Sequence, residues 1–170
     1  MIIAGIDPGV NGAIVILDSG GNVISKNVSP KIAKKIDVHG YVNMLRQKID
    51  LVVIEDVHAI FGCSAGSTFA FGQASMLPIA AATALRIPIM LVPPKTWQKE
   101  MHVGIPLMYK PKKATQKNPS KDTKAMSLMA FKRLLPEIDA RATARSTNPH
   151  DGIVDAALIA LYGRRIRNGR

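Results

Sequence analysis

The sequence predicts an α/β fold with a mixed five-stranded sheet, three antiparallel strands followed by two parallel ones, flanked by helices. Apolar runs joined by glycine-containing turns predict a meander of strands over residues 1–7, 13–18 and 22–27. Two later apolar runs, residues 51–56 and 87–92, each follow a helical pattern, which is typical of parallel strands. A length of 170 residues is typical of one domain with a sizeable core.

Helical spacing of apolar residues predicts helices in five segments. They are residues 38–49, 67–85, 93–101, 121–135 and 149–167. Pro78 should kink or divide the second helix, because proline lacks the backbone N–H that a helix interior needs. Trp97 lies in an amphipathic turn and is predicted to be a core residue rather than a platform for base stacking. Asn148 is the predicted N-cap of the last helix, with Pro149 at its first position.

The chain is strongly basic, with a formal net charge of +11 and an isoelectric point near 10.0. This excess is larger than solubility requires, so it predicts a polyanionic partner, and nucleic acid is favoured over a membrane surface. No apolar run reaches the roughly 18 residues of a membrane span, and the N-terminus lacks the pattern of a signal peptide. We therefore expect a cytoplasmic protein without a membrane partner.

The candidate DNA contacts lie mostly in one lysine-rich part of the chain. Residues 103–120 have no helical or strand period and are predicted to form a basic, mobile loop. A cationic loop would offset the repulsion between phosphates and an acidic site. The lysines that we expect at DNA are Lys110, Lys112, Lys113, Lys117, Lys121 and Lys124. A second basic segment, the C-terminal tail 164–170, is equally consistent with DNA contact and with a solvated face.

Four carboxylates stand at the ends of apolar segments. Asp7 ends the first strand, Glu55 ends the fourth, and the pair Asp151 and Asp155 lies in the first turns of the last helix. Residues four apart on a helix are offset by about 40°, so the helical pair shares one face. If the first and fourth strands are neighbours and the last helix crosses them, all four side chains converge. Taken singly, each has an ordinary interpretation as a turn residue, a solvated strand end or a helix-dipole partner.

Carboxylates that close together repel one another and would partly protonate unless a divalent cation neutralised them. A ligand set made only of oxygen atoms suits a hard ion, Mg²⁺ or Mn²⁺. The chemistry that such a cluster supports is two-metal hydrolysis of a phosphodiester bond. In so basic a chain, the cluster predicts a catalytic site that acts on nucleic acid.

Four motifs, in chain order, match those of a known family. GIDPGVNGA looks like a first-strand motif with a metal-binding Asp, and VVIED looks like a fourth-strand motif with a catalytic Glu. FGQASMLPIAAA is similar to the helix that follows, and HDGIVDAALIALYGRR resembles a final helix with two acidic residues. Over nearly its whole length, the chain thus resembles the RuvC-like Holliday junction resolvases of the RNase H-like superfamily. The D-G-x-x-D-A form and VPPKTWQK are closest to the phage and viral branch.

The resemblance implies a single RNase H-like nuclease domain over residues 1–170. It implies that two Mg²⁺ ions, for which Mn²⁺ can substitute, are bound by Asp7, Glu55, Asp151 and Asp155. It further implies a homodimer whose two sites nick opposing strands of a four-way junction, in the host cytoplasm if a phage encodes the protein. Gly9 and Gly12 would then keep bulk away from the scissile phosphate.

The sequence departs from the family pattern at two histidines. His58 stands where the bacterial resolvases carry an aromatic wedge just after the Glu, and we expect it to contact DNA. His150 precedes Asp151 and is a candidate for assisting proton transfer, although a first-turn histidine is more often simply exposed. The last two acidic residues are four apart rather than three, which still keeps them on one face.

Other functions stay open at this point. A broader branched-DNA nuclease would cut flaps and forks during phage DNA processing. A non-catalytic DNA-binding module would keep the fold, but it would gain nothing from four clustered carboxylates facing DNA. An actin-like nucleotide-binding domain is disfavoured by the length of the chain and by the lack of a second phosphate-loop candidate.

Overall fold

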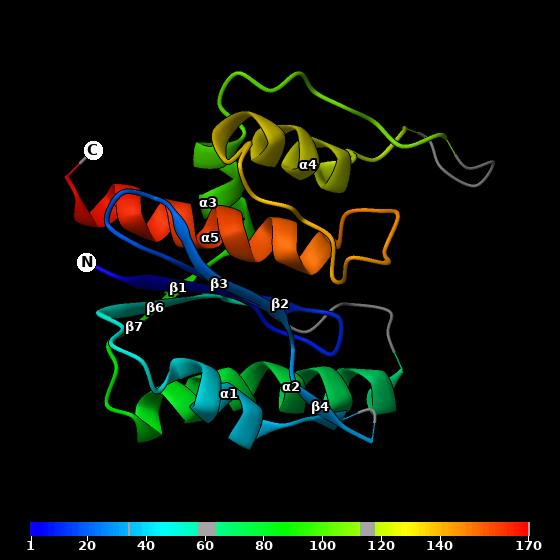
Figure 1. Ribbon diagram of the computed structural model, residues 1–170. Coiled ribbons are helices and arrows are strands. Elements are labelled where there is room, and N and C mark those ends of the chain that lie inside the picture. The colour runs from blue at the N-terminus through cyan, green and yellow to red at the C-terminus, as the bar shows by residue number, and fades with distance from the viewer. Residues whose placement is uncertain (34, 58–63, 113–117, 170) are drawn as a thin grey trace.

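A mixed five-stranded sheet forms the centre of the protein (Figure 1). The computed structural model describes residues 1–33, 35–57, 64–112 and 118–169. The strands of the sheet are β1 (Ile3–Asp7), β2 (Ala13–Leu17), β3 (Val23–Val28), β6 (Leu51–Glu55) and β7 (Ile89–Val92). Their order is β3-β2-β1-β6-β7, with antiparallel pairing among the first three and parallel pairing of β1 with β6 and of β6 with β7. The predicted sheet is confirmed.

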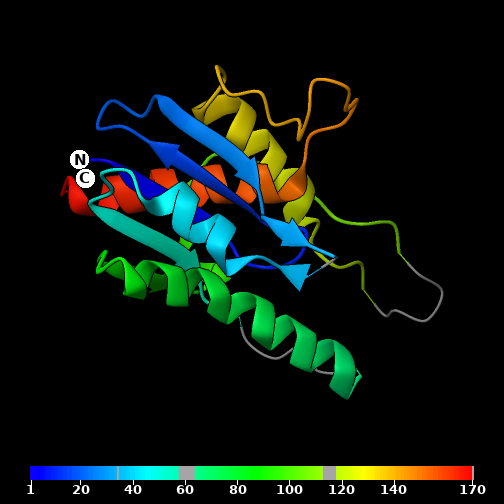
Figure 2. The ribbon, with the colours of Figure 1, turned by 60° about the horizontal axis from the view of Figure 1, so that its bottom comes forward.

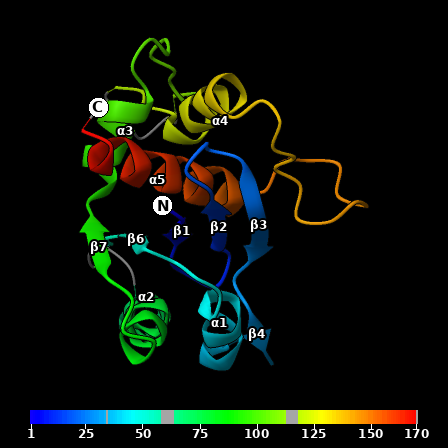
Figure 3. The ribbon, with the colours of Figure 1, turned by 60° about the vertical axis from the view of Figure 1, so that its left-hand side comes forward.

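Helices cover both faces of this sheet (Figure 3). The helices are α1 (Val38–Leu45), α2 (Ala65–Ala84), α3 (Pro94–Met101), α4 (Thr123–Leu134) and α5 (Asp151–Arg167). α1 and α2 lie on one face, α5 lies on the other, and α3 and α4 pack against α5. A short hairpin that the sequence did not predict, β4 (Lys31–Ile32) and β5 (Lys35–Ile36), forms a separate two-stranded sheet. Among the described residues, no helix is both long and apolar enough to cross a membrane.

The start of α5 differs from the prediction. The helix begins at Asp151 with His150 as its N-cap, so Asn148 and Pro149 lie outside it. The backbone of His150 is still extended, and its N–H donates to the carbonyl of Ala140 at 2.8 Å. A contact with a distant segment therefore decides where the helix begins, and local capping preferences do not.

Pro78 does not divide α2, which is helical on both sides of it. The residue is buried, and the next turn contributes Ala81 and Ala82 to the core beneath the sheet. This packing outweighs the roughly 3 kcal/mol that a proline costs in a helix interior.

Alternate residues of the central strands face two separate cores. Towards α5 point Ile3, Val15, Leu17 and Val53. Towards α1 and α2 point Ala4, Ile6, Ile14, Ile16, Val52 and Ile54. Because β1 and β6 are buried on both faces, their carboxyl ends are held firmly, and Asp7 and Glu55 occupy those ends.

Glycines let α5 lie directly on β1. A Cβ at Gly5 would stand 2.2 Å from the carbonyl oxygen of Ala156 and 2.3 Å from the backbone nitrogen of Ala160. A Cβ at Gly152 would meet the turn after β1, and one at Gly12 would stand 2.0 Å from the carbonyl oxygen of Asp7. Gly12 is therefore required by the turn itself. The close contact sets the first turns of α5 beside the end of β1.

We expect Gly5→Ala to destabilise the protein by about 1–3 kcal/mol, because its methyl group would meet immovable backbone atoms of α5. The matched control is Gly72→Ala in α2, where a Cβ would meet nothing within 4 Å. That change should be neutral or stabilise the helix by up to about 1 kcal/mol. Urea unfolding of both variants measures the difference, and equal stabilities would contradict the close contact.

Candidate active site

The four predicted carboxylates come from three elements that meet at one end of the sheet. Asp7 is the last residue of β1, Glu55 is the last residue of the neighbouring strand β6, and α5 carries Asp151 and Asp155. A cleft of about 670 Å³ opens here, lined by the turn after β1, the first turns of α5 and residues of α2. Asp7, Asp151 and Asp155 line it, and Glu55 is half-buried behind them.

Burial and mutual repulsion raise the pKa values of two of these carboxyl groups, Asp7 and Asp155. Burial raises the pKa of Asp7 to about 8, and the charges of Asp155 and Glu55 add to the shift. Burial likewise raises the pKa of Asp155 to about 7; a hydrogen bond with Ser127 opposes the shift, while the charges of Glu55 and Asp151 add to it. These side chains thus share one electrostatic environment.

Two buried polar atoms at the cleft lack hydrogen-bond partners among the described residues. They are Oδ1 of Asp155 and Nδ1 of His150. An unsatisfied buried oxygen costs about 1–3 kcal/mol, so it usually marks a site for a water or an ion.

The donor set fits a hard divalent cation. Its ligands would all be carboxylate oxygens, their mutual repulsion is relieved by positive charge, and one buried oxygen is free to coordinate. Within the described part of the chain, however, no three His, Cys, Asp or Glu side chains are drawn together closely enough to hold an ion as they stand. Positive charge would have to draw the side chains closer.

Lys124 of α4 is a member of this cluster. Its Nζ donates to Oδ2 of Asp151 at 2.5 Å, and this hydrogen bond raises the pKa of Lys124. Its charge also lowers the pKa of Asp7, against the larger effect of burial. Both partners are about two-thirds exposed, so the pair itself adds little stability. One of the lysines predicted for DNA contact therefore lies at the acidic cleft.

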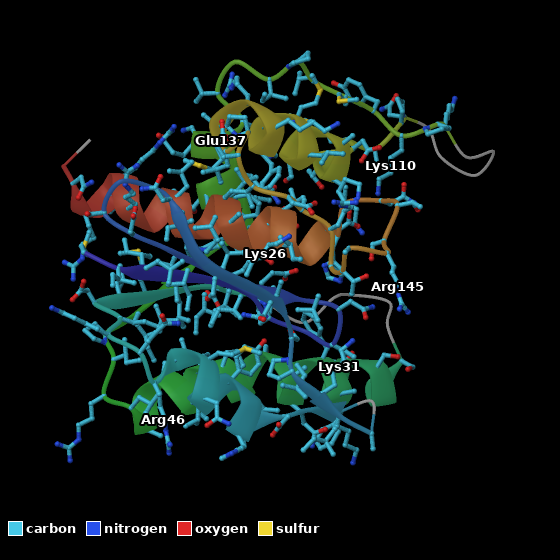
Figure 4. The ribbon with its side chains drawn as sticks, viewed as in Figure 1. Lys26, Lys31, Arg46, Lys110, Glu137 and Arg145 are labelled. Carbon is cyan, nitrogen blue, oxygen red and sulfur yellow. The ribbon has the colours of Figure 1, made fainter. Side chains whose placement is uncertain are left out.

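The other predicted DNA contacts are partly described. Lys110 and Lys112 are exposed on the segment between α3 and α4, which has no helix or strand in its described residues. Lys121 forms an isolated bridge with Tyr109, and the two backbones exchange further hydrogen bonds beside it. Figure 4 places Lys110 on the side of the molecule where α5 begins. His58, Lys113 and Lys117 lie outside the described residues.

The predicted basic tail belongs largely to the fold. Arg164, Arg165 and Arg167 form the last turn of α5. Nε of Arg164 donates to the carbonyl of Ser19 at 2.8 Å, and Arg165 pairs with Glu100 at 3.4 Å. These contacts attach the end of α5 to neighbouring segments.

Sequence reasoning missed two residues behind the carboxylates. Trp97 is fully buried, as predicted, but its indole N–H also donates to Oε1 of Glu55 at 2.8 Å. Ser127, which is only 2% exposed, hydrogen-bonds to Asp155. The available signals were that a buried indole needs an acceptor and that Ser127 interrupts an apolar stripe of α4.

Comparison with known proteins gives a structural match only. No family model matches the sequence, and no curated protein does. The structure of Thermus thermophilus RuvC in complex with a Holliday junction substrate matches with a TM-score of 0.66 and 16% identity, over 99% of this chain and 97% of that one. A second Thermus thermophilus RuvC structure matches with a TM-score of 0.63 and 18% identity, over the same shares. The chain therefore has the RuvC-like, RNase H-like fold that its sequence predicted.

Without divalent cations, we expect the free energy of unfolding to fall as the pH is raised from 5 to 9. Asp7 and Asp155 have raised pKa values in the folded state, so unfolding releases protons in this range and becomes easier as they ionise. Asp7→Asn should reduce this loss by roughly 1–3 kcal/mol. Urea unfolding in EDTA at both pH values measures it.

The matched control for this experiment is Asp18→Asn. A hydrogen bond from Asn22 lowers the pKa of the partly exposed Asp18, which is therefore ionised throughout the range. The control should keep the pH dependence of the wild type. If Asp7→Asn also kept it, Asp7 would not be a repelled carboxylate.

Proposed function

We propose that the protein is a metal-dependent endonuclease that cuts branched DNA, with four-way junctions as its main substrate. The observation that carries this proposal is the cleft at which β1, β6 and α5 bring four carboxylates together and raise the pKa values of Asp7 and Asp155. The net charge of +11 supports a nucleic-acid substrate. The similarity in fold to a RuvC structure that holds a junction supports the choice of branched DNA.

The residues of the cleft have separate roles in this proposal. Asp7, Glu55, Asp151 and Asp155 would hold two Mg²⁺ ions, or Mn²⁺ in their place. Bound there, such ions activate a water and stabilise the leaving oxygen in phosphodiester hydrolysis. Lys124, once Asp151 turns to a cation, is an exposed ammonium group at the mouth of the cleft, where it would contact a phosphate. His150 lines the same cleft and stays a candidate for assisting proton transfer.

A homodimer would present two such clefts to one junction. The N-terminal part of α2 extends beyond the strands (Figure 2), and the helix exposes Phe69 and Met76 beside the cleft. Both side chains border a largely apolar hollow that shares Val10, Ala70 and Ala74 with the cleft. Exposed apolar patches of this kind favour association, and a two-fold dimer suits a two-fold substrate because each subunit then cuts once.

The alternatives are distinguished by substrate range and by chemistry. A broader nuclease would cut flaps and forks as readily as junctions. A DNA-binding module without activity is disfavoured, since repelled carboxylates beside a DNA surface weaken binding. Membership of the phage branch and a place in the host cytoplasm remain predictions from the sequence.

We expect the purified protein to nick two opposing strands of a labelled four-way junction in Mg²⁺ and to cut nothing in EDTA. Asp155→Asn should lower the rate by at least about 100-fold, because ligand loss removes several kcal/mol of transition-state stabilisation. Asp139→Asn is the matched control, since Asp139 is exposed and pairs with Arg141 away from the cleft. Full activity of Asp155→Asn would refute the proposal, and equal cutting of flaps would favour the broader nuclease.

The exposed lysines before α4 should contribute to DNA affinity in a salt-dependent way. Replacing Lys110 and Lys112 by Ala should reduce the slope of log K against log salt by about two, because each phosphate contact contributes roughly 0.9. The control replaces Arg46 and Lys48, which are also exposed, and Figure 4 places Arg46 at the other end of the molecule from Lys110. Fluorescence anisotropy with junction DNA in EDTA gives both slopes, and an unchanged slope would remove the segment from the interface.

A further inference from the structure

Glu55 is held from behind by a residue that cannot reach DNA. The indole N–H of Trp97, from α3, donates to its Oε1 at 2.8 Å, and Trp97 is fully buried. A carboxylate only accepts hydrogen bonds, and an indole has one donor, so this contact sets the direction of one oxygen. The bond leaves the other oxygen of Glu55 without this constraint.

Asp155 is held in a similar way from α4. The buried hydroxyl of Ser127 hydrogen-bonds to it and also lies 3.2 Å from Nε2 of His102. A hydroxyl has one proton, so when it donates to the ionised carboxylate it must accept from His102. With Asp155 ionised, as it would be when it binds a cation, the order of donors is therefore His102 to Ser127 to Asp155.

One imidazole ring connects the two supports. His102 is the C-cap of α3, and its ring meets the ring of Trp97 edge to face, with centroids 6.2 Å apart and planes at 78°. Burial lowers the pKa of His102, which keeps the ring neutral, and a neutral ring with its proton on Nε2 suits the bond to Ser127. Trp97, which holds Glu55, and Ser127, which holds Asp155, are thus connected through His102.

We propose that Trp97, His102 and Ser127 form a positioning frame that fixes the orientation of the Glu55 and Asp155 carboxylates for the binding of a divalent cation. The inference rests on the proposed function, because it concerns the same carboxylates. Partners behind metal ligands set ligand orientation, and their loss commonly lowers metal affinity. Here the frame also holds together two carboxylates that repel each other, so that less ordering remains to be done when the cation binds.

The test measures Mn²⁺ binding to the free protein, by electron paramagnetic resonance of unbound Mn²⁺ and by calorimetry. Trp97→Phe keeps the ring without its donor, and Ser127→Ala removes the hydroxyl. Each should weaken Mn²⁺ binding by about 10- to 100-fold. Junction affinity in EDTA should stay as in the wild type, because the frame does not line the cleft.

His102 supplies the comparison that separates positioning from packing. His102→Leu should weaken Mn²⁺ binding as Ser127→Ala does, and His102→Gln should recover much of the loss, because its amide N–H can donate to Ser127. Met101→Leu is the matched control, since Met101 is a fully buried neighbour in the same core. The proposal is overturned if the Trp97 and Ser127 variants bind Mn²⁺ as tightly as the control.

A second measurement needs only the wild type and so survives any failure of a variant to fold. Trp97 is the single tryptophan of the chain, and its donor contacts Glu55. Its fluorescence should therefore change during a Mg²⁺ titration, with the midpoint found by calorimetry. An emission that stays constant while calorimetry records binding would also overturn the proposal.

The two levels of inference fail separately. A wild type that cuts no branched DNA refutes the proposed function, whereas its Mn²⁺ affinities still test the frame. If the wild type cuts junctions but the Trp97 and Ser127 variants bind Mn²⁺ as tightly as the wild type does, the frame alone is refuted. A wild type that binds no Mn²⁺ refutes both.

Discussion

The structure depends most on the close approach of α5 to β1. Gly5 has no side chain, so the backbone of α5 at Ala156 and Ala160 can lie where a Cβ would otherwise stand. Asp155 adjoins one of these contact residues, and Asp7 follows Gly5 by two residues along the strand. The contact that builds the core on this face therefore also sets the two most strongly shifted carboxyl groups beside each other. Packing and chemistry share one constraint.

In the folded state, this arrangement keeps carboxylates that repel one another close together. Asp7 and Asp155 are buried enough to favour their neutral forms, and a hydroxyl and an indole stabilise the charged forms of Asp155 and Glu55 only in part. Strands buried on both faces supply the rigidity that keeps the carboxylates in place. The folded protein is therefore less stable when no cation is bound, and such a loss of stability is a common cost of a functional site.

The surroundings of the cleft divide into a buried and an exposed set. Trp97 and Ser127 lie beneath the carboxylates and act on their geometry. Lys124 lies at the rim, pairs with Asp151 and is largely exposed, so it can change partners at small cost. A positive rim around a negative centre lets a polyanion approach an acidic site.

The sequence alone determined the five strands of the central sheet and their succession along the chain, because alternation, helical spacing and turn glycines are local properties. Four motifs in chain order supplied the likeness to RuvC-like proteins. The sequence also placed Asp7 and Glu55 at strand ends and put Asp151 and Asp155 on one helix face. Tertiary structure alone decided where α5 begins, that α2 continues through Pro78, and that Trp97 donates to a residue 42 positions away. Those outcomes depend on which distant backbone or side-chain group is nearby, and no local pattern contains that information.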